Sequence, residues 1–289
     1  MLRLPALRPL ALGGLALALG ACDATDPGDL AEADLEDAAV IVASALALDT
    51  GGALEDAAAG ASLAGSLDAA GRSAGPDRPG CETSRDFDEA AITWTVAIDC
   101  ERGSPDGRRY ASFERLSTYQ FLGADGQPQR ERRGAAVVNY EVLSGESEFR
   151  SPRRQNTLAS LGADLAVTRL DRDLVSVSGT YERAGSAQIQ GARGERAVEY
   201  ALSLTLDRVE GPGSRLRTWR GAVAGTVTGT LQATITTARA GGEPTVTEVD
   251  RDFTVTFPTD GQGGRVAQIA LGGLRFRADI ETGDLLGLP

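Results

Sequence analysis

Two pairs of carboxylates in this chain have a spacing that suits hydrolytic chemistry. Asp171 lies two residues before Asp173, and Asp250 lies two residues before Asp252. In a strand, residues two apart project from one face about 7 Å apart, and glycoside hydrolysis needs two carboxyl groups roughly 5 to 10 Å apart. Each pair has an arginine between its members and sits at the edge of an expected strand, which favours exposed turn acids. A carboxylate-dependent glycan hydrolase is therefore an alternative, and we assign no catalytic residue.

The residue types that the chain lacks exclude most other catalytic chemistry. Its 289 residues include no histidine, and all 29 basic residues are arginine. Without histidine there is no imidazole-activated nucleophile and no common zinc or haem site. Without lysine there is no Schiff base and no phosphate-binding P-loop. The glycines of residues 221–229 lie in a threonine-rich strand pattern, where packing explains them better than a nucleotide. The sequence predicts a non-enzymatic protein without a cofactor or a metal.

One group of arginines is a candidate contact site. Ser144 and Gly145 form an expected hairpin turn, which would fold the flanking strands back along each other. Six arginines flank that hairpin: Arg130, Arg132, Arg133, Arg150, Arg153 and Arg154. Guanidinium groups bind phosphate and sulfate bidentately, so the set predicts an anion-binding patch. The alternative is a solvated sheet edge whose charges deter pairing with other strands.

The first residues have the layout of a secretory signal peptide. Arg3 and Arg8 precede an apolar run over residues 10–21 that ends in small residues. That run is about a dozen residues, whereas a spanning helix needs roughly 20. Residues 19–22, Leu-Gly-Ala-Cys, resemble the lipobox of bacterial lipoproteins. In that family the signal is cut before the cysteine, whose thiol receives a diacylglycerol. The resemblance covers residues 1–22 only and implies a lipid anchor on Cys22.

The residues after Cys22 bear on location and partners. Asp23 resembles an inner-membrane retention signal of some enterobacterial lipoproteins, whereas Asp23, Asp26 and Asp29 together resemble a surface-export tag of other groups. We expect the cell envelope, and the outer membrane rather than the inner one. The net charge of −12, with most of the excess acid in residues 23–100, argues against nucleic-acid binding. The expected partners are the membrane, through the lipid, and an envelope glycan or another envelope protein.

The two remaining cysteines, Cys81 and Cys100, are expected to form a disulfide. An exported chain folds in an oxidising compartment, where pairing is the default. Apolar residues alternate over 92–98, which predicts a strand. A turn near residues 88–91 would fold the preceding stretch back and place the two cysteines nearly opposite each other. Closing a loop of about 20 residues stabilises the fold by roughly 3 kcal/mol in the chain-entropy model.

Composition and periodicity divide the chain into five segments. They are a signal peptide (1–21), a lipidated tether (22–28), an acidic helical segment (29–70), a linker (71–80) and an antiparallel β domain (81–289). The linker is assigned from its prolines and glycines.

One or two short, alanine-rich helices are expected within 29–70. Asp29 can cap the first turn, with Glu32 at the third helical position, and Gly51 supplies a stop. Apolar residues then recur at helical spacing: Leu35, Ala39, Val42 and Leu46. A second, poorer helix is marked by Leu54, Ala58, Ala61 and Ala69, and glycines weaken it.

Beyond Cys81 the apolar residues recur with period two. The clearest example is the run Val198, Tyr200, Leu202, Leu204 and Leu206. About ten such runs, separated by glycine-rich turns, predict antiparallel strands that are apolar on one face and polar on the other. The pattern fits a sandwich, a meander or an up-and-down barrel. A transmembrane barrel shares the alternation, but 5% aromatic residues is a thin supply for two interfacial girdles.

Three functions follow from these features. The favoured one is a non-enzymatic binding or structural module, displayed at the envelope on a lipid tether. The second is a carrier that encloses an apolar ligand in a lipocalin-like barrel or half-barrel, and a filled core would argue against it. The third is the carboxylate-dependent hydrolase, which a cleft with two converging acids and a raised pKa would support.

Overall fold

The computed structural model describes residues 30–64, 80–152, 154–169, 174–191, 194–213, 219, 223–238, 243–257 and 265–287. The two helices are α1 (Glu32–Leu46) and α2 (Ala53–Ala64). The strands are β1 (Cys81–Asp88), β2 (Thr93–Gly103), β3 (Tyr110–Leu122), β4 (Pro128–Gln129), β5 (Val137–Ser151), β6 (Arg154–Arg169), β7 (Leu174–Gly191), β8 (Gly194–Pro212), β9 (Ala224–Thr237), β10 (Thr245–Phe257), β11 (Val266–Leu271) and β12 (Leu274–Asp279). Helices and strands belong to one compact unit, Ala31–Pro289.

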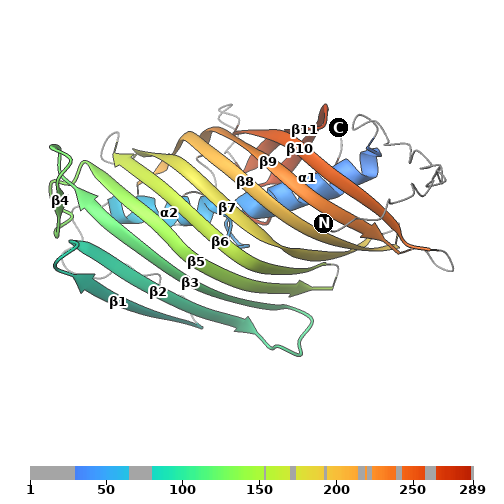
Figure 1. The fold of residues 1–289 in the computed structure, drawn as a ribbon, viewed down its shortest axis with the longest axis horizontal. Coiled ribbons are helices and arrows are strands. Elements are labelled where there is room, and N and C mark those ends of the chain that lie inside the picture. Colours follow the sequence, from blue (N-terminus) through green and yellow to red (C-terminus); the bar gives the residue numbers. More distant parts are fainter. Residues whose placement is uncertain are drawn as a thin grey trace, which may run out of the picture. The chain divides into compact units, whose positions relative to one another are not determined.

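The strands form one open, antiparallel sheet (Figure 1). Their order is β1-β2-β3-β5-β6-β7-β8-β9-β10-β11-β12, and the short β4 pairs with β3. Each long strand therefore lies beside its neighbour in the chain, which is the topology of a meander. The prediction of a mainly β fold, preceded by one or two short alanine-rich helices, is confirmed. Of the three predicted architectures, the structure is the meander.

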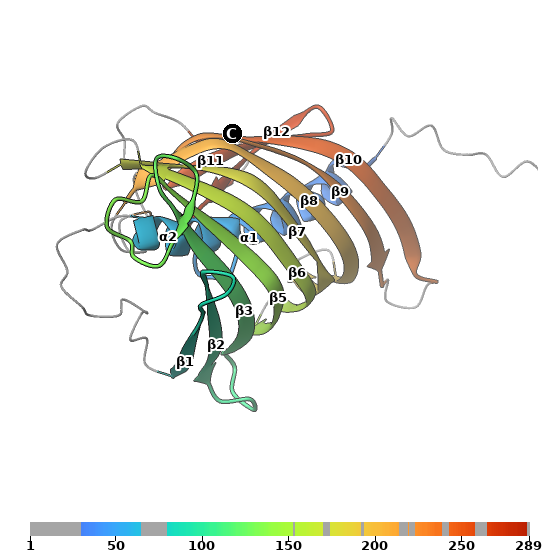
Figure 2. The same cartoon turned by 60° about the vertical axis from the view of Figure 1, so that its left-hand side comes forward.

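The sheet is curved, and both helices lie on its concave face (Figure 2). Helix α2 packs on β5 to β8, and α1 packs on β9 to β12. Both helices are apolar around most of their circumference, as expected for helices that are buried on all sides. Their many alanines let the backbone approach the sheet closely. The helices thus serve as the second layer that covers the apolar face of the sheet.

Alternation along the strands decides which residues face the helices. In β8 the five apolar residues predicted to share one face are all buried: Val198, Tyr200, Leu202, Leu204 and Leu206. The residues between them are exposed. Strands β7 and β8 have 18 and 19 residues, far longer than the five or six that are typical. Register shifts interrupt the pairing in β3, β6, β7 and β8, and such bulges bend and twist long strands.

The predicted hairpin turn at Ser144 and Gly145 is wrong. Strand β5 continues through both residues, and the chain reverses after Ser151, which pairs with Arg154. Gly145 is present because Leu161 packs where its side chain would be: a Cβ there would lie 2.8 Å from Leu161 Cδ2. A glycine within a strand often marks such a close approach instead of a turn.

The start of helix α1 differs from the prediction. Helix α1 starts at Glu32 with Ala31 as its N-cap and without a side-chain cap, so Glu32 is the first helical residue and not the predicted third. Asp29, the predicted cap, lies outside the described residues. The predicted apolar positions are confirmed, because Leu35, Ala39, Val42 and Leu46 are all buried. In α2, Leu54, Ala58 and Ala61 are also buried, and Ala69 lies outside the described residues. Neither α1 nor α2 has the length and hydropathy that a membrane-crossing helix requires.

The predicted disulfide is confirmed. Cys81 and Cys100 are bonded to each other and are direct register partners in the β1–β2 pair. Residues 89–92 form the turn between these strands. At the other end of the sheet, the backbone after β12 pairs with the α1–α2 loop, since Leu48 N donates to Ile280 O at 3.0 Å and Asp49 N donates to Glu281 O at 2.9 Å. These bonds tie the last part of the chain to the helices.

Candidate functional site

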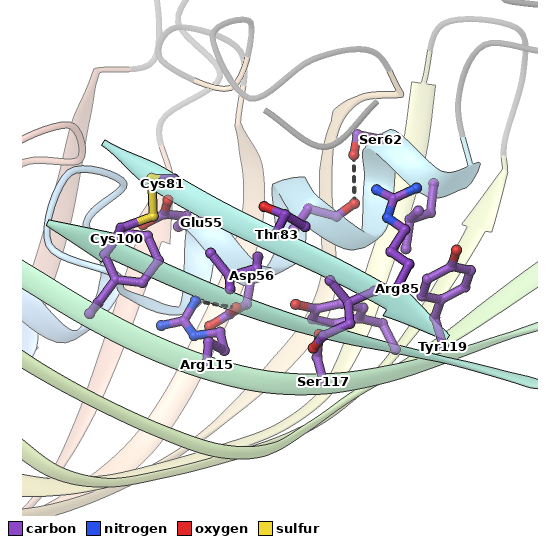
Figure 3. Close-up of a pocket in the computed structure, with 16 residues that line it drawn as sticks. Glu55, Asp56, Ser62, Cys81, Thr83, Arg85, Cys100, Arg115, Ser117 and Tyr119 are labelled. Atoms are coloured by element: carbon purple, nitrogen blue, oxygen red, sulfur yellow. Dashed lines mark hydrogen bonds and ion pairs between the residues drawn. A yellow bond between two sulfur atoms is a disulfide. The ribbon is translucent and has the colours of Figure 1, made fainter. Parts of the chain in front are cut away.

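A cavity of about 80 Å³ lies between α2 and the concave side of β1, β2, β3 and β5 (Figure 3). Helix α1 does not pack on these strands, so this part of the sheet is covered less completely than the rest. The apolar part of the wall consists of Ala59, Leu63, Val96, Ile98, Phe113, Tyr119, Tyr140 and the disulfide. The polar part consists of Glu55, Asp56, Ser62, Thr83, Arg85, Arg115 and Ser117.

A buried ion pair forms one wall of this cavity. Arg115 in β3 and Asp56 in α2 approach to 2.5 Å, and both side chains are almost fully buried. Arg115 also donates to Gly51 O at 3.1 Å, which fixes the α1–α2 loop to the sheet. The second carboxylate oxygen, Asp56 Oδ2, has no hydrogen-bond partner in the described part of the chain. Asp56 thus lines the cavity while one of its carboxylate oxygens is buried without a hydrogen bond in the described chain.

Burial changes the ionisation of this site. Removal from water raises the pKa of Asp56 to about 7, although the charge of Arg115 opposes that rise. Burial likewise raises the pKa of Tyr140 and of Tyr181, so both phenols stay protonated. The hydroxyl of Tyr181 donates to Gly51 O at 3.2 Å. Near neutral pH, Asp56 can therefore either accept a proton or donate one at the cavity wall.

An aromatic cluster lies on the same side of the sheet, toward the β1–β2 turn. The ring centroids of Phe87 and Trp94 are 4.8 Å apart, those of Trp94 and Tyr119 are 6.0 Å apart, and those of Tyr119 and Phe121 are 5.4 Å apart. The guanidinium of Arg130 lies 4.6 Å from the centroid of the Phe87 ring. Tyr119 also lines the cavity, so its apolar wall continues into this cluster.

The structure does not bring the six predicted arginines together. Because β5 has no turn at Gly145, Arg130, Arg132 and Arg133 lie near the start of β5, whereas Arg150 and Arg154 lie near its other end. Arg153 is outside the described residues. Strand β5 has 15 residues, and at about 3.3 Å per residue the two groups are a strand length apart. The single patch predicted from the sequence is therefore absent among the described arginines.

Three of these arginines have structural partners. Arg132 donates to Ser62 O at 3.1 Å. Arg169, which is not one of the six, donates to Ala64 O, so both arginines satisfy carbonyls at the C-terminus of α2. Positive charge is favourable there because of the helix dipole. Burial, with the nearby charge of Arg169, lowers the pKa of Arg132. Arg150 pairs with Glu148 at 2.5 Å, and Arg130 lies 3.7 Å from Glu89.

Of the two predicted carboxylate pairs, the structure describes only Asp250 and Asp252. Asp250 and Asp252 are exposed on the face of β10 that points away from the helices, opposite Gln232 and Thr230. Asp171, Asp173 and the predicted lipidation site lie outside the described residues. No group of three acids or cysteines in the described chain is arranged to hold a metal ion.

Comparisons of the chain with protein-family models, with curated proteins and with solved structures found no match.

Proposed function

We propose that this chain is a non-enzymatic binding module, held at a bacterial cell envelope by a lipid on Cys22. Its cavity beneath α2 takes the apolar end of a small ligand. The observation that carries this proposal is the cavity itself, whose wall is mainly aliphatic and aromatic and lies where the sheet lacks the cover of α1. An apolar group that enters such a cavity leaves water and gains dispersion contacts.

The size of the cavity suits one end of an alkyl chain. Its volume of about 80 Å³ is well below the roughly 300–1,000 Å³ of a pocket that encloses a drug-sized molecule. Asp56 Oδ2 supplies one polar contact on the wall. Near or below neutral pH this carboxyl is substantially protonated, which favours a ligand with a neutral hydroxyl over one with a carboxylate at that position.

The hydrolase alternative has less support from the same residues. Glu55 and Asp56 both line the cavity, and the pKa of Asp56 is raised. However, consecutive residues on a helix project about 100° apart, and Asp56 Oδ1 is already held by Arg115. The cavity is also smaller than a sugar ring with its hydroxyl groups requires.

Thermal unfolding of the mature chain with and without ligand tests this proposal. Dodecanol and dodecanoic acid are the probes, and glucose is the polar control. A ligand at a hundredfold excess over its Kd stabilises the folded state by about 2.7 kcal/mol. We expect dodecanol to raise the melting temperature more than dodecanoic acid, and glucose to leave it unchanged. Equal melting temperatures with and without both alkyl probes would remove the proposal.

A variant that fills the cavity tests whether the alkyl chain binds there. Ala59→Phe places a ring in the cavity and should abolish the shift caused by dodecanol. Ala33→Phe is the matched control, because Ala33 is also a half-buried helical alanine but lies in α1, away from the cavity. It should keep the shift. A shift that survives in Ala59→Phe would place the alkyl chain elsewhere.

A further inference from the structure

A buried arginine and a half-buried arginine on the concave face lie near one tyrosine. Arg183 in β7 is only 3% exposed, and its NH2 group lies 3.3 Å from the hydroxyl of Tyr200 in β8. Its guanidinium carbon lies 5.9 Å from the centroid of the Tyr200 ring. Arg154 comes from the start of β6. Burial lowers the pKa of Arg154, and so does the neighbouring charge of Arg183, while Tyr200 opposes both effects.

The strand register explains how Arg154 and Tyr200 come to share a space although β7 lies between their strands. Gly185 in β7 pairs with Leu158 on one side and with Tyr200 on the other. A Cβ on Gly185 would lie 3.0 Å from the Tyr200 hydroxyl, so that hydroxyl sits above the glycine. The next inward residue of β7 is Ala187, which has only a methyl group. No long side chain of β7 therefore separates β6 from β8 at this place.

The polar atoms around Tyr200 are short of partners. Nε and NH1 of Arg183, Nε and NH2 of Arg154, and Oδ1 of Asn156 are buried and make no hydrogen bond in the described chain. The amide of Asn156 can present its NH2 group instead, because the two orientations are equivalent in shape. The charge of Asp284 favours the ionised form of Arg154, and the charge of Arg183 acts on Asp56. Asp284 is exposed and accepts a hydrogen bond from the Thr282 hydroxyl at 2.9 Å.

Other buried arginines on the same face have carboxylate partners. Arg115 pairs with Asp56, and Arg196 pairs with Asp37. A buried charge without a partner is costly, and removal of one member of a buried pair typically destabilises a protein strongly. Arg154 and Arg183 lie near each other without such a direct ion pair in the described part of the chain, so a bound anion would remove an energetic cost as well as supply hydrogen-bond acceptors.

We propose that Arg154, Arg183, Asn156 and Tyr200 form an anion site for a phosphoryl group. Two guanidinium groups match the charge of a phosphate, and their parallel N–H groups match its oxygens. The phenol of Tyr200 donates one further hydrogen bond. The proposal does not rest on the alkyl-binding function, because none of these four residues lines the cavity beneath α2.

Titration of the full chain with inorganic phosphate tests the site. Calorimetry and thermal unfolding measure the binding, at a constant ionic strength set with chloride. We expect a saturable rise in melting temperature with phosphate and none with chloride. Glycerol 3-phosphate and dihexanoyl phosphatidic acid are two further probes. Binding of dihexanoyl phosphatidic acid alone would identify a lipid headgroup as the source of the phosphoryl group. If no probe binds above the chloride baseline, the site does not exist.

Substitutions separate an anion site from a purely structural arginine pair. Arg183→Met should weaken phosphate binding roughly tenfold or more, since it removes charged hydrogen bonds. In phosphate-free buffer, the same variant should melt no lower than the wild type, because it removes an unpaired buried charge. Arg196→Met is the matched control: it should melt lower, because it leaves Asp37 unpaired, yet still respond to phosphate. Arg154→Met provides an independent second variant, with the same loss expected. Normal phosphate affinity in both Arg183→Met and Arg154→Met would overturn the assignment.

Discussion

Asp56 and Arg115 stabilise each other's charge where neither side chain reaches water. The pair joins α2 to β3, and the charge of Glu55 in the same helix also acts on this guanidinium. The net contribution of the pair to stability is small, since desolvation of two charges offsets most of their attraction. The loss of one partner lowers stability much more, because the other charge then stays buried alone.

The first prediction concerns that asymmetry. Asp56→Leu and Arg115→Met should each lower the free energy of unfolding by about 3–5 kcal/mol, whereas the double variant should lose much less. Urea unfolding measures all three. Arg265→Met is the control, because the side chain of Arg265 is 58% exposed, and an ion pair with an exposed member contributes little to stability. Additive losses in the double variant would mean that the two charges do not depend on each other.

The second prediction concerns pH. The pKa of Asp56 is about 7 in the folded chain, whereas its ordinary value is 3.8, so between these values the folded state holds more protons than the unfolded state. Its stabilising contribution is complete below pH 3.8 and is lost as the pH rises through 7. The free energy of unfolding, relative to that of Asp56→Asn, should therefore fall between pH 4 and pH 7, by at most about 1.4 kcal/mol per unit.

Urea midpoints at pH 4, 5.5, 7 and 8 measure this slope. The comparison with Asp56→Asn is needed because burial also raises the pKa of Asp37, which acts in the same direction in both proteins. If the free energy of unfolding of the wild type instead rises with pH relative to that of Asp56→Asn, then Asp56 is ionised in the folded chain well below neutral pH.

Part of the candidate site could be predicted from the sequence. Phe113, Arg115, Ser117 and Tyr119 follow the period-two pattern of β3, so the inward direction of Arg115 could be predicted from its neighbours. Asp56 could not be predicted in the same way. It stands in a helix that is buried around most of its circumference, where no polar face identifies the direction of a side chain. The pairing of the two residues depends on how α2 lies across the sheet, which no local pattern encodes.

At the scale of elements, strands were more predictable than turns. Alternation marks a strand because one face is buried, and the buried rows of β8 and β9 follow it closely. A glycine is ambiguous, because it permits either a turn or a close contact within a strand. At Gly145 the contact is with Leu161. At Gly229, the predicted role in packing is confirmed: a Cβ there would lie 2.6 Å from Phe253 Cζ and 2.3 Å from Ser203 O.

The third prediction follows from that contact. Gly229→Ala should lower the free energy of unfolding by about 1–3 kcal/mol, because the added methyl group meets a carbonyl oxygen and an aromatic ring. Thr228→Ala is the control on the same strand, since Thr228 is exposed and its loss should change stability by about 0.5 kcal/mol or less. Denaturant unfolding of the two variants makes the comparison. A neutral Gly229→Ala would imply that β9 and β10 can separate locally without cost.

At the scale of the whole described unit, a single sheet buries its apolar face because two helices pack on it in place of a second sheet. Helix α2 packs on β5 to β8 and α1 packs on β9 to β12, so the strands at the β1 edge have only partial cover. The disulfide joins the two outermost strands at that edge, and it also lines the cavity. The position of the cavity therefore follows from the limited reach of the helices, together with a covalent link that compensates for the thinner core there.

The last prediction concerns attachment to the membrane. If Cys22 carries two or three acyl chains, each buried methylene contributes about 0.8 kcal/mol of membrane affinity, and the chain should sediment with membranes. Cys22→Ser should release the protein from that fraction, and its mass should no longer include the lipid. The double variant Cys81→Ser, Cys100→Ser is the control: it lacks the disulfide but should keep the lipid mass. Cell fractionation and mass spectrometry of the intact protein measure both properties. Unchanged sedimentation and mass in Cys22→Ser would show that another segment attaches the chain, and the binding module would then have to be considered without a lipid tether.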